Sequence, residues 1–180
     1  FGEVEERNID QIVLANFIMK NDGLILLVNY GGPSEIISTI GGKEKRIYYN
    51  RYDNSVISLK NWNNEYFITL GYKNHFLLDN NCNEIKKIPL DDYLINKLIP
   101  IDNISGLDVS YPSVSLVNIT NGDYIWNYRH KEYSEEFIIK NKLININGDI
   151  INFTFDIVYR NGDKERESFK LNIEDGSLIE

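Results

Sequence analysis

Two histidines and a single cysteine are the residues of this sequence that could supply a nucleophile and its base. His75 precedes Cys82 closely enough for one hairpin to bring a thiolate and an imidazole together. No third group that would orient the imidazole and no family signature accompanies the pair. A surface histidine beside a half-buried cysteine is therefore the simpler interpretation, and we expect no catalytic residue and no enzymatic activity.

Oxygen-bearing side chains in the segment 79–84 resemble the start of a calcium-binding loop. The EF-hand pattern requires glycine at its sixth position and glutamate at its twelfth, where this sequence has Glu84 and Leu90. A polar turn is the preferred interpretation. His75 and His130 each lack a second histidine or cysteine at zinc-ligand spacing, so we expect neither a metal nor a cofactor.

Aromatic side chains close to carboxylates are the remaining candidates for a binding role. Tyrosine and tryptophan are common anchors of protein interfaces, and flanking carboxylates suit a basic partner. Core packing is the competing interpretation for each ring, and the adjacent Asp91 and Asp92 also suit the start of a helix. We expect partner contact from Trp62, Asp91, Asp92, Trp126, Tyr128, Glu135 and Glu136.

Net charge limits the classes of partner. The chain carries a formal charge of −8 and an isoelectric point of about 4.9. Its longest basic cluster, Lys43, Lys45 and Arg46, is interrupted by Glu44. A nucleic-acid binder needs clustered cations, so we expect no direct nucleic-acid binding. Acidity instead favours a basic protein partner, or serves only solubility.

Cysteine usage and hydropathy bear on the compartment. One cysteine permits no intrachain disulfide, which favours a reducing environment. No apolar run approaches the length of a membrane span. We expect a cytoplasmic protein without membrane contact; a secreted or periplasmic location is the alternative, because the sequence begins at Phe1 rather than at methionine.

The elements that must position these residues are mostly short strands. Asn-Gly and Asp-Gly turn signals separate runs rich in isoleucine, valine, phenylalanine and tyrosine, and such turns favour tight hairpins. The clearest hairpin joins 151–159 to 169–173 around Asn161 and Gly162. A short helix is expected within 90–98, between two prolines. Further strands are expected at 12–20, 24–30, 35–40, 46–49, 55–59, 66–72, 76–78, 113–119, 124–128 and 136–146.

A weak internal repeat indicates how these strands are arranged. Residues 117–125 align without gaps with 171–179, and 78–85 is a degenerate third copy. Each copy reads as a strand end, a tight turn and the start of the next strand. A recurrence of roughly forty to fifty-five residues approaches the size of one propeller blade.

The repeat resembles that of PQQ-like and WD-like propellers, with Trp126 at the aromatic position of one copy and Glu180 at that position of the other. A closed propeller needs at least four blades of about forty residues, so this chain could barely close one. We therefore expect an all-β, mainly antiparallel fold built as a partial or small propeller-like stack of meanders, with a β-sandwich as the alternative. One domain over 1–180 is expected; the alternative is two halves, 1–98 and 113–180, joined by 99–112.

A small acidic β-domain without catalytic groups is similar in character to bacterial immunity proteins of contact-dependent growth inhibition and related toxin systems. That resemblance implies an inhibitor that neutralises a basic toxin domain, such as a nuclease, by occluding it. The alternative is a carbohydrate- or surface-protein-binding module of a secreted propeller or sandwich protein, in which Trp62 and Trp126 would stack on sugar rings.

Overall fold

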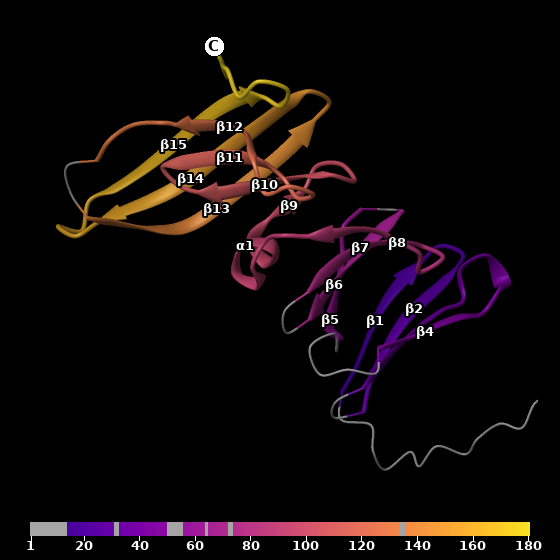
Figure 1. Cartoon of the computed structure of the whole chain (residues 1–180). Helices are drawn as coiled ribbons and strands as arrows, with labels where there is room; N and C mark the ends of the chain where they lie inside the picture. Colours follow the sequence, from indigo (N-terminus) through magenta and orange to yellow (C-terminus); the bar gives the residue numbers. More distant parts are fainter. Residues whose placement is uncertain (1–13, 31–32, 50–55, 64, 72–73, 134–135) are drawn as a thin grey trace, which may run out of the picture. The chain divides into compact units, whose positions relative to one another are not determined.

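The computed structural model of the protein is built almost entirely from antiparallel sheets, as the sequence predicts (Figure 1). It describes residues 14–180 except 31–32, 50–55, 64, 72–73 and 134–135. The one α-helix among the described residues, α1 (Asp92–Lys97), lies inside the predicted range, and a 3₁₀ turn covers Ile40–Gly42. Neither helical segment of the described chain is long and apolar enough to cross a bilayer.

The described residues form sixteen strands in four sheets, and each sheet is a four-stranded meander in chain order. The first two sheets contain β1 (Leu14–Lys20), β2 (Gly23–Asn29), β3 (Ser34–Ser38) and β4 (Lys45–Tyr49), then β5 (Val56–Asn61), β6 (Tyr66–Gly71), β7 (His75–Asp79) and β8 (Glu84–Ile88). The other two contain β9 (Ile99–Pro100), β10 (Ser105–Ser110), β11 (Ser113–Asn118) and β12 (Tyr124–Arg129), then β13 (Phe137–Asn147), β14 (Ile150–Tyr159), β15 (Lys164–Asn172) and β16 (Leu178–Ile179). The predicted all-β, mainly antiparallel fold built from meanders is thus confirmed.

The predicted hairpin is the pair β14 and β15. Its turn places Gly162 at a φ of 94°, a value that glycine adopts without the strain imposed by a Cβ. Alternate residues of both strands are buried, as the period of two requires. Phe153 pairs with Phe169 and Ile151 with Leu171 across the ladder, so both strands present apolar side chains to one side.

The three copies of the internal repeat occupy one structural position, the connection between the third and fourth strands of a sheet. In two copies, Asn118 and Asn172 each donate a backbone N–H at 2.9 Å to the residue five places later. The third copy closes with Asp79 donating to Asn83 at 3.1 Å. Glycine has a positive φ in the first two turns, and Cys82 has a φ of 60° in the third. The repeat therefore encodes one local turn used in three sheets.

The chain divides into two compact units, each holding two sheets. The N-terminal unit comprises the chain up to Asn96 with Pro100–Ile104 and Ile119–Gly122, and the C-terminal unit comprises Lys97–Ile99, Ser105–Asn118 and Asp123–Glu180. The range 99–112, expected as a connection, contains the strands β9 and β10.

Each unit has its own buried apolar side chains. In the N-terminal unit, the first two sheets share one core cluster of Ile18, Ile25, Leu27, Ile36, Tyr49, Val56, Leu59, Phe67, Leu78 and Cys82. In the C-terminal unit, the buried apolar side chains include Leu107, Val114, Leu116, Ile151, Phe153, Phe155, Ile157, Phe169 and Leu171. Burial of this kind is the main stabilising contribution in both units.

Candidate functional site

A buried carboxylate lies at the centre of the candidate site in the C-terminal unit. Glu167 is on β15, and strand alternation places it on the same face as Phe169 and Leu171. Its side chain is only 8% exposed. A buried carboxylate is costly unless cations and hydrogen-bond donors surround it, so its neighbours are the informative residues.

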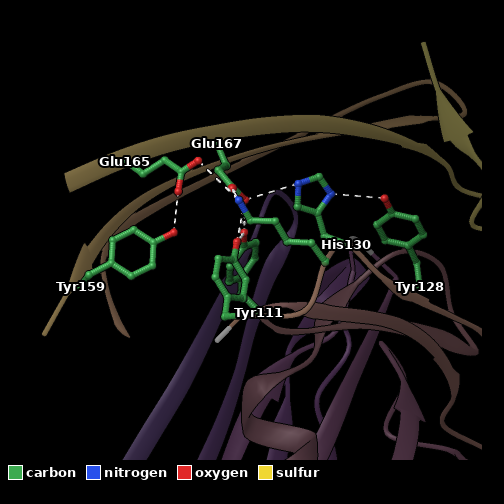
Figure 2. A network of polar contacts seen from close by, with 8 residues as sticks. Tyr111, Tyr128, His130, Tyr159, Glu165 and Glu167 are labelled. Atoms are coloured by element: carbon green, nitrogen blue, oxygen red, sulfur yellow. Dashed lines mark hydrogen bonds and ion pairs between the residues drawn. The ribbon is translucent and has the colours of Figure 1, made fainter. Parts of the chain in front are cut away.

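Four polar side chains surround Glu167 (Figure 2). The hydroxyls of Tyr111 and Tyr133 donate to its carboxylate, the latter at 2.7 Å. Lys131 forms an ion pair with it, and His130 Nε2 lies 3.3 Å from it. Tyr111 lies in the turn between β10 and β11, and the other three residues follow β12. The carboxylate therefore joins the two sheets of this unit.

His130 is held in one orientation. Its Nδ1 lies 3.2 Å from the Tyr128 hydroxyl, and its ring stacks on Phe169 with centroids 4.3 Å apart. Burial, and then the charge of Lys131, lower the pKa of His130. The lowered pKa favours the neutral imidazole, whose two nitrogens face the Glu167 carboxylate and the Tyr128 hydroxyl.

A second carboxylate extends the network toward the surface. Glu165 accepts the Tyr159 hydroxyl at 2.5 Å and lies 3.4 Å from Lys131 Nζ. Its pKa is lowered, first by the hydrogen bond from Tyr159 and then by Lys131. Burial raises the pKa of Tyr133 well above its ordinary value, with the charge of Glu165 adding to the effect. Tyr133 is therefore a neutral donor at neutral pH.

An open depression of about 910 Å³ lies next to this network. The hydroxyls of Tyr133 and Tyr159 form hydrogen bonds in the network, and the same two side chains line the depression. We call this depression the groove; its lining residues are Pro112, Arg129, Tyr133, Glu136, Phe137, Ile138, Val158, Tyr159 and Arg160. Aromatic, apolar and guanidinium groups thus line one concave surface.

A smaller depression of about 320 Å³ lies along β13, the strand that also contributes Phe137 and Ile138 to the groove. From β13 it is lined by Ile139, Lys140 and Lys142. Tyr111 and Phe155, whose ring centroids are 4.3 Å apart, also line it, together with Val109. Tyr111 therefore connects this depression to the Glu167 network.

The charged and polar side chains of the network interact with one another. Glu167 is matched by Lys131, and the two tyrosines act as donors. Within the described ranges, no group of three or more His, Cys, Asp and Glu side chains could hold a metal ion. The arrangement can fix the positions of aromatic rings beside the groove, and that is the chemical role we assign to it.

The structure places both tryptophans inside the protein. Trp62 is fully buried, and Trp126 is 8% exposed. The Trp126 indole donates to the Ile173 carbonyl at 2.8 Å and lies against Gly176, where a Cβ would come within 2.7 Å of the ring. Both rings are core groups, so we do not assign them to a partner surface.

Most of the acidic residues expected to contact a partner protein interact with other residues of this chain. Asp91 accepts the backbone N–H of Leu94 at 2.8 Å and so caps α1. Asp92 lies 2.9 Å from His75, and the exposed Glu136 lies 3.4 Å from Arg160 at the groove. Glu135 lies outside the described residues.

Tyr128 is half-buried and contacts His130. Of the residues expected to contact a partner, Glu136 lines the groove itself and Tyr128 borders its supporting network.

The pair His75 and Cys82 does not form a nucleophilic site. His75 is 6% exposed, so the expectation of a surface histidine is wrong. It is buried because Nδ1 accepts the Gly71 N–H at 3.2 Å and Nε2 contacts Asp92. Burial raises the pKa of the Cys82 thiol to about 11, which keeps it protonated. The neighbouring segment is the expected polar turn, in which Asp79 accepts two backbone N–H groups of its own loop.

Sequence reasoning missed the network and most of the groove. One signal was available: alternation along β15 continues from Leu171 through Phe169 to Glu167, so the apolar face carries a charged residue. A charge at such a position requires a buried partner. Tyr111 and Lys131 could not be identified as its partners from sequence, because they come from distant segments.

Comparisons with known proteins do not place the chain in a family. No protein-family model and no curated protein matches it. Among solved structures, the complex of the fission yeast SREBP-SCAP binding domains is similar with 15% sequence identity and a TM-score of 0.32. The similarity covers 69% of this chain and 36% of that chain, so this chain spans about a third of the matched one. A similarity of this extent carries neither a fold nor a function across.

Proposed function

We propose that the chain is a non-enzymatic module that binds another protein through the groove of its C-terminal unit. The observation that carries this proposal is the composition of the groove, where Tyr133, Tyr159 and Phe137 lie with Arg129 and Arg160. Tyrosine and arginine dominate the energetics of protein interfaces, above all in concave sites that exclude water.

Preorganisation supports the same proposal. Tyr133 is fixed by Glu167, and Tyr159 is fixed by Glu165. Immobilising a side chain on binding costs about 0.5–1.5 kcal/mol each, so rings already held in place reduce the cost of association. The Glu167 network thereby gives the groove a rigid lining without a role in any reaction.

The specific function that we propose to test first is inhibition: the module binds a toxin domain and neutralises it by occluding it. The resemblance in character to immunity proteins supports it. The proposal rests on the groove rather than on the acidic residues, because Asp91 and Asp92 already have partners in the chain. Stacking of sugars on the indoles is not proposed, since Trp62 and Trp126 are buried.

Site-specific photo-crosslinking tests the proposal. A photoreactive phenylalanine analogue at Ile138, which lines the groove and is 55% exposed, should crosslink one protein in the native cells. The same analogue at Ile85, 47% exposed on β8, is the matched control.

The crosslinked protein is then purified and titrated with variants of the full chain. Ile138→Asp should weaken binding at least about tenfold, a loss of about 1.4 kcal/mol, whereas Ile85→Asp should leave the affinity unchanged. Equal effects of the two variants, or the same adducts from both positions, would overturn the proposal. If the captured protein contains a toxin domain, coexpression of that domain with the chain tests whether the chain neutralises it.

A further inference from the structure

The free edge of β13 is the feature that extends the proposed function. This strand spans 11 residues, and within the described chain it pairs with β14 alone. Half of the backbone N–H and C=O groups of an edge strand point away from its neighbour and remain available to another strand. β13 is therefore a template for strand addition.

The direction of its hydrogen bonds shows which groups face outward. The Arg160 N–H donates to the Glu136 carbonyl at 3.1 Å, which makes these residues a hydrogen-bonded pair at the start of the ladder. In an antiparallel ladder the next pair is not hydrogen-bonded, and the pattern alternates. Phe137 and Ile139, opposite Tyr159 and Ile157, therefore turn their backbone groups to the free edge.

Both depressions of the site lie along this edge. The groove is lined by Phe137 and Ile138, and the smaller depression by Ile139, Lys140 and Lys142. Side chains from the other sheet of the same unit complete the lining with Val109, Tyr111, Pro112 and Arg129. An added strand would thus find hollows for its side chains beside the groups that it pairs with.

The charge of this lining identifies the occupant. Four cationic side chains, Arg129, Lys140, Lys142 and Arg160, line the two depressions. Arg160 pairs with Glu136 at 3.4 Å and Arg129 lies 4.0 Å from Glu132, so the excess of positive charge comes mainly from Lys140 and Lys142. This cationic strip belongs to a chain whose net charge is −8. An acidic strand complements it, and opposite charges across a strand pair are favourable.

A second copy of the chain is a poor occupant of the same edge. Pairing β13 with itself would bring the lysines of both copies onto one ribbon, where like charges repel. Edge lysines are one feature by which proteins prevent self-association of strands, whereas the same lysines attract an acidic segment.

We propose that an extended acidic segment of a partner protein adds to β13 as a fifth strand of its sheet. Its backbone pairs with the outward groups of Phe137 and Ile139, its carboxylates meet Lys140 and Lys142, and its apolar side chains enter the groove. This inference rests on the proposed function, because it describes how a partner engages the same groove.

Selection from a random library of ten-residue displayed peptides on the immobilised full chain tests the inference. Selected peptides should carry net negative charge. The tightest binder is then synthesised with N-methyl groups on either of the two alternating sets of backbone nitrogens. In an added strand only one set faces β13, so methylation of that set should weaken binding at least about tenfold and methylation of the other should not.

Paired charge reversals supply the protein control. Lys140→Glu with Lys142→Glu should weaken the binding of the selected peptide at least about tenfold. Lys86→Glu with Lys87→Glu, the same change at two exposed residues of β8, should not. Selection of cationic peptides, equal tolerance of both methylated sets, or no peptide that depends on the β13 lysines would overturn strand addition.

Crosslinking from Ile138 separates this failure from failure of the proposed function. If a protein is captured at Ile138 and its affinity is lost in the Ile138→Asp variant, the groove is a binding site. That conclusion would hold even if strand addition were overturned. Absence of both a captured protein and a selected peptide would overturn both proposals.

Discussion

The two units differ in how their buried carboxylates are paired. In the N-terminal unit, the core cluster is apolar, and it includes residues of both sheets, among them Leu27 and Phe67. Its buried Glu35 pairs with Arg46 within the same sheet. In the C-terminal unit, the buried Glu167 takes partners from the other sheet.

This difference shows what each arrangement provides. Apolar contacts stabilise without strict direction, whereas a buried carboxylate with four partners fixes the orientation of each partner. The directional arrangement lies beside the groove: Tyr133 and Tyr159 line the groove, and Tyr111 lines the adjoining depression. The C-terminal unit therefore adds a directional polar network to its apolar core, beside the groove.

Removal of the central carboxylate should produce the largest effect. Glu167→Ala removes the closer of the two carboxylates that pair with Lys131, leaving Glu165 at 3.4 Å, and it removes the acceptor of two tyrosine hydroxyls. Breaking a buried ion pair from one side costs about 3–5 kcal/mol, and the lower end applies because Lys131 is 37% exposed. Urea unfolding followed by Trp126 fluorescence in a Trp62→Phe background measures the loss in this unit.

Glu35→Ala is the matched change in the N-terminal unit, read from Trp62 fluorescence in a Trp126→Phe background. Arg46 is 45% exposed and regains water, so we expect a loss of no more than about 2 kcal/mol. Equal losses for the two variants would remove the distinction between the units.

The turn packed against Trp126 should give the next largest effect. Gly176 has a φ of 69°, and an added Cβ would lie 2.7 Å from the Trp126 ring. The positive φ and the overlap together should lower the free energy of unfolding by about 2–3 kcal/mol for Gly176→Ala. Gly148→Ala, at a φ of 59° with open space around it, should cost only about 1 kcal/mol. Urea unfolding of both variants checks the difference, and equal losses would contradict the packing of Trp126 on this turn.

The stability of the C-terminal unit should depend on pH through His130. Because the pKa of His130 is lowered on folding, the unfolded chain binds more protons between the folded value and the ordinary value of about 6.5. Stability is therefore complete above about pH 6.5 and falls as the pH decreases below it. Urea unfolding between about pH 7 and 5.5 measures this decline. His130→Gln should flatten it, and an unchanged slope would assign the pH dependence to another group.

The smallest effect concerns thiol reactivity in the N-terminal unit. The pKa of Cys82 is raised to about 11 by burial, so at pH 8 the folded protein should react with a thiol reagent far more slowly than the urea-unfolded protein. Labelling of the folded protein as fast as that of the unfolded protein would show that the core cluster opens readily. The reaction rate therefore reports on this unit alone.

Most strands, the short helix and the hairpin of β14 and β15 could be predicted from sequence because they depend on local turn chemistry and on alternation. The repeated turn was found for the same reason. The strands β8, β9 and β10 were not predicted. The burial of Trp126 could not be predicted because the ring packs against Gly176, fifty residues away in the turn between β15 and β16. The Glu167 network could not be predicted because its partners follow from the packing of two sheets.

Hydrogen exchange at the free edge of β13 tests the central claim most directly. The amide N–H groups of Phe137 and Ile139 are measured in the full chain, with and without the tightest selected peptide at saturation. We predict that both exchange at least about tenfold more slowly in the complex, because they become hydrogen-bonded to the added strand. Unchanged exchange at both amides, with slowing elsewhere in the chain, would contradict a binding surface at this edge.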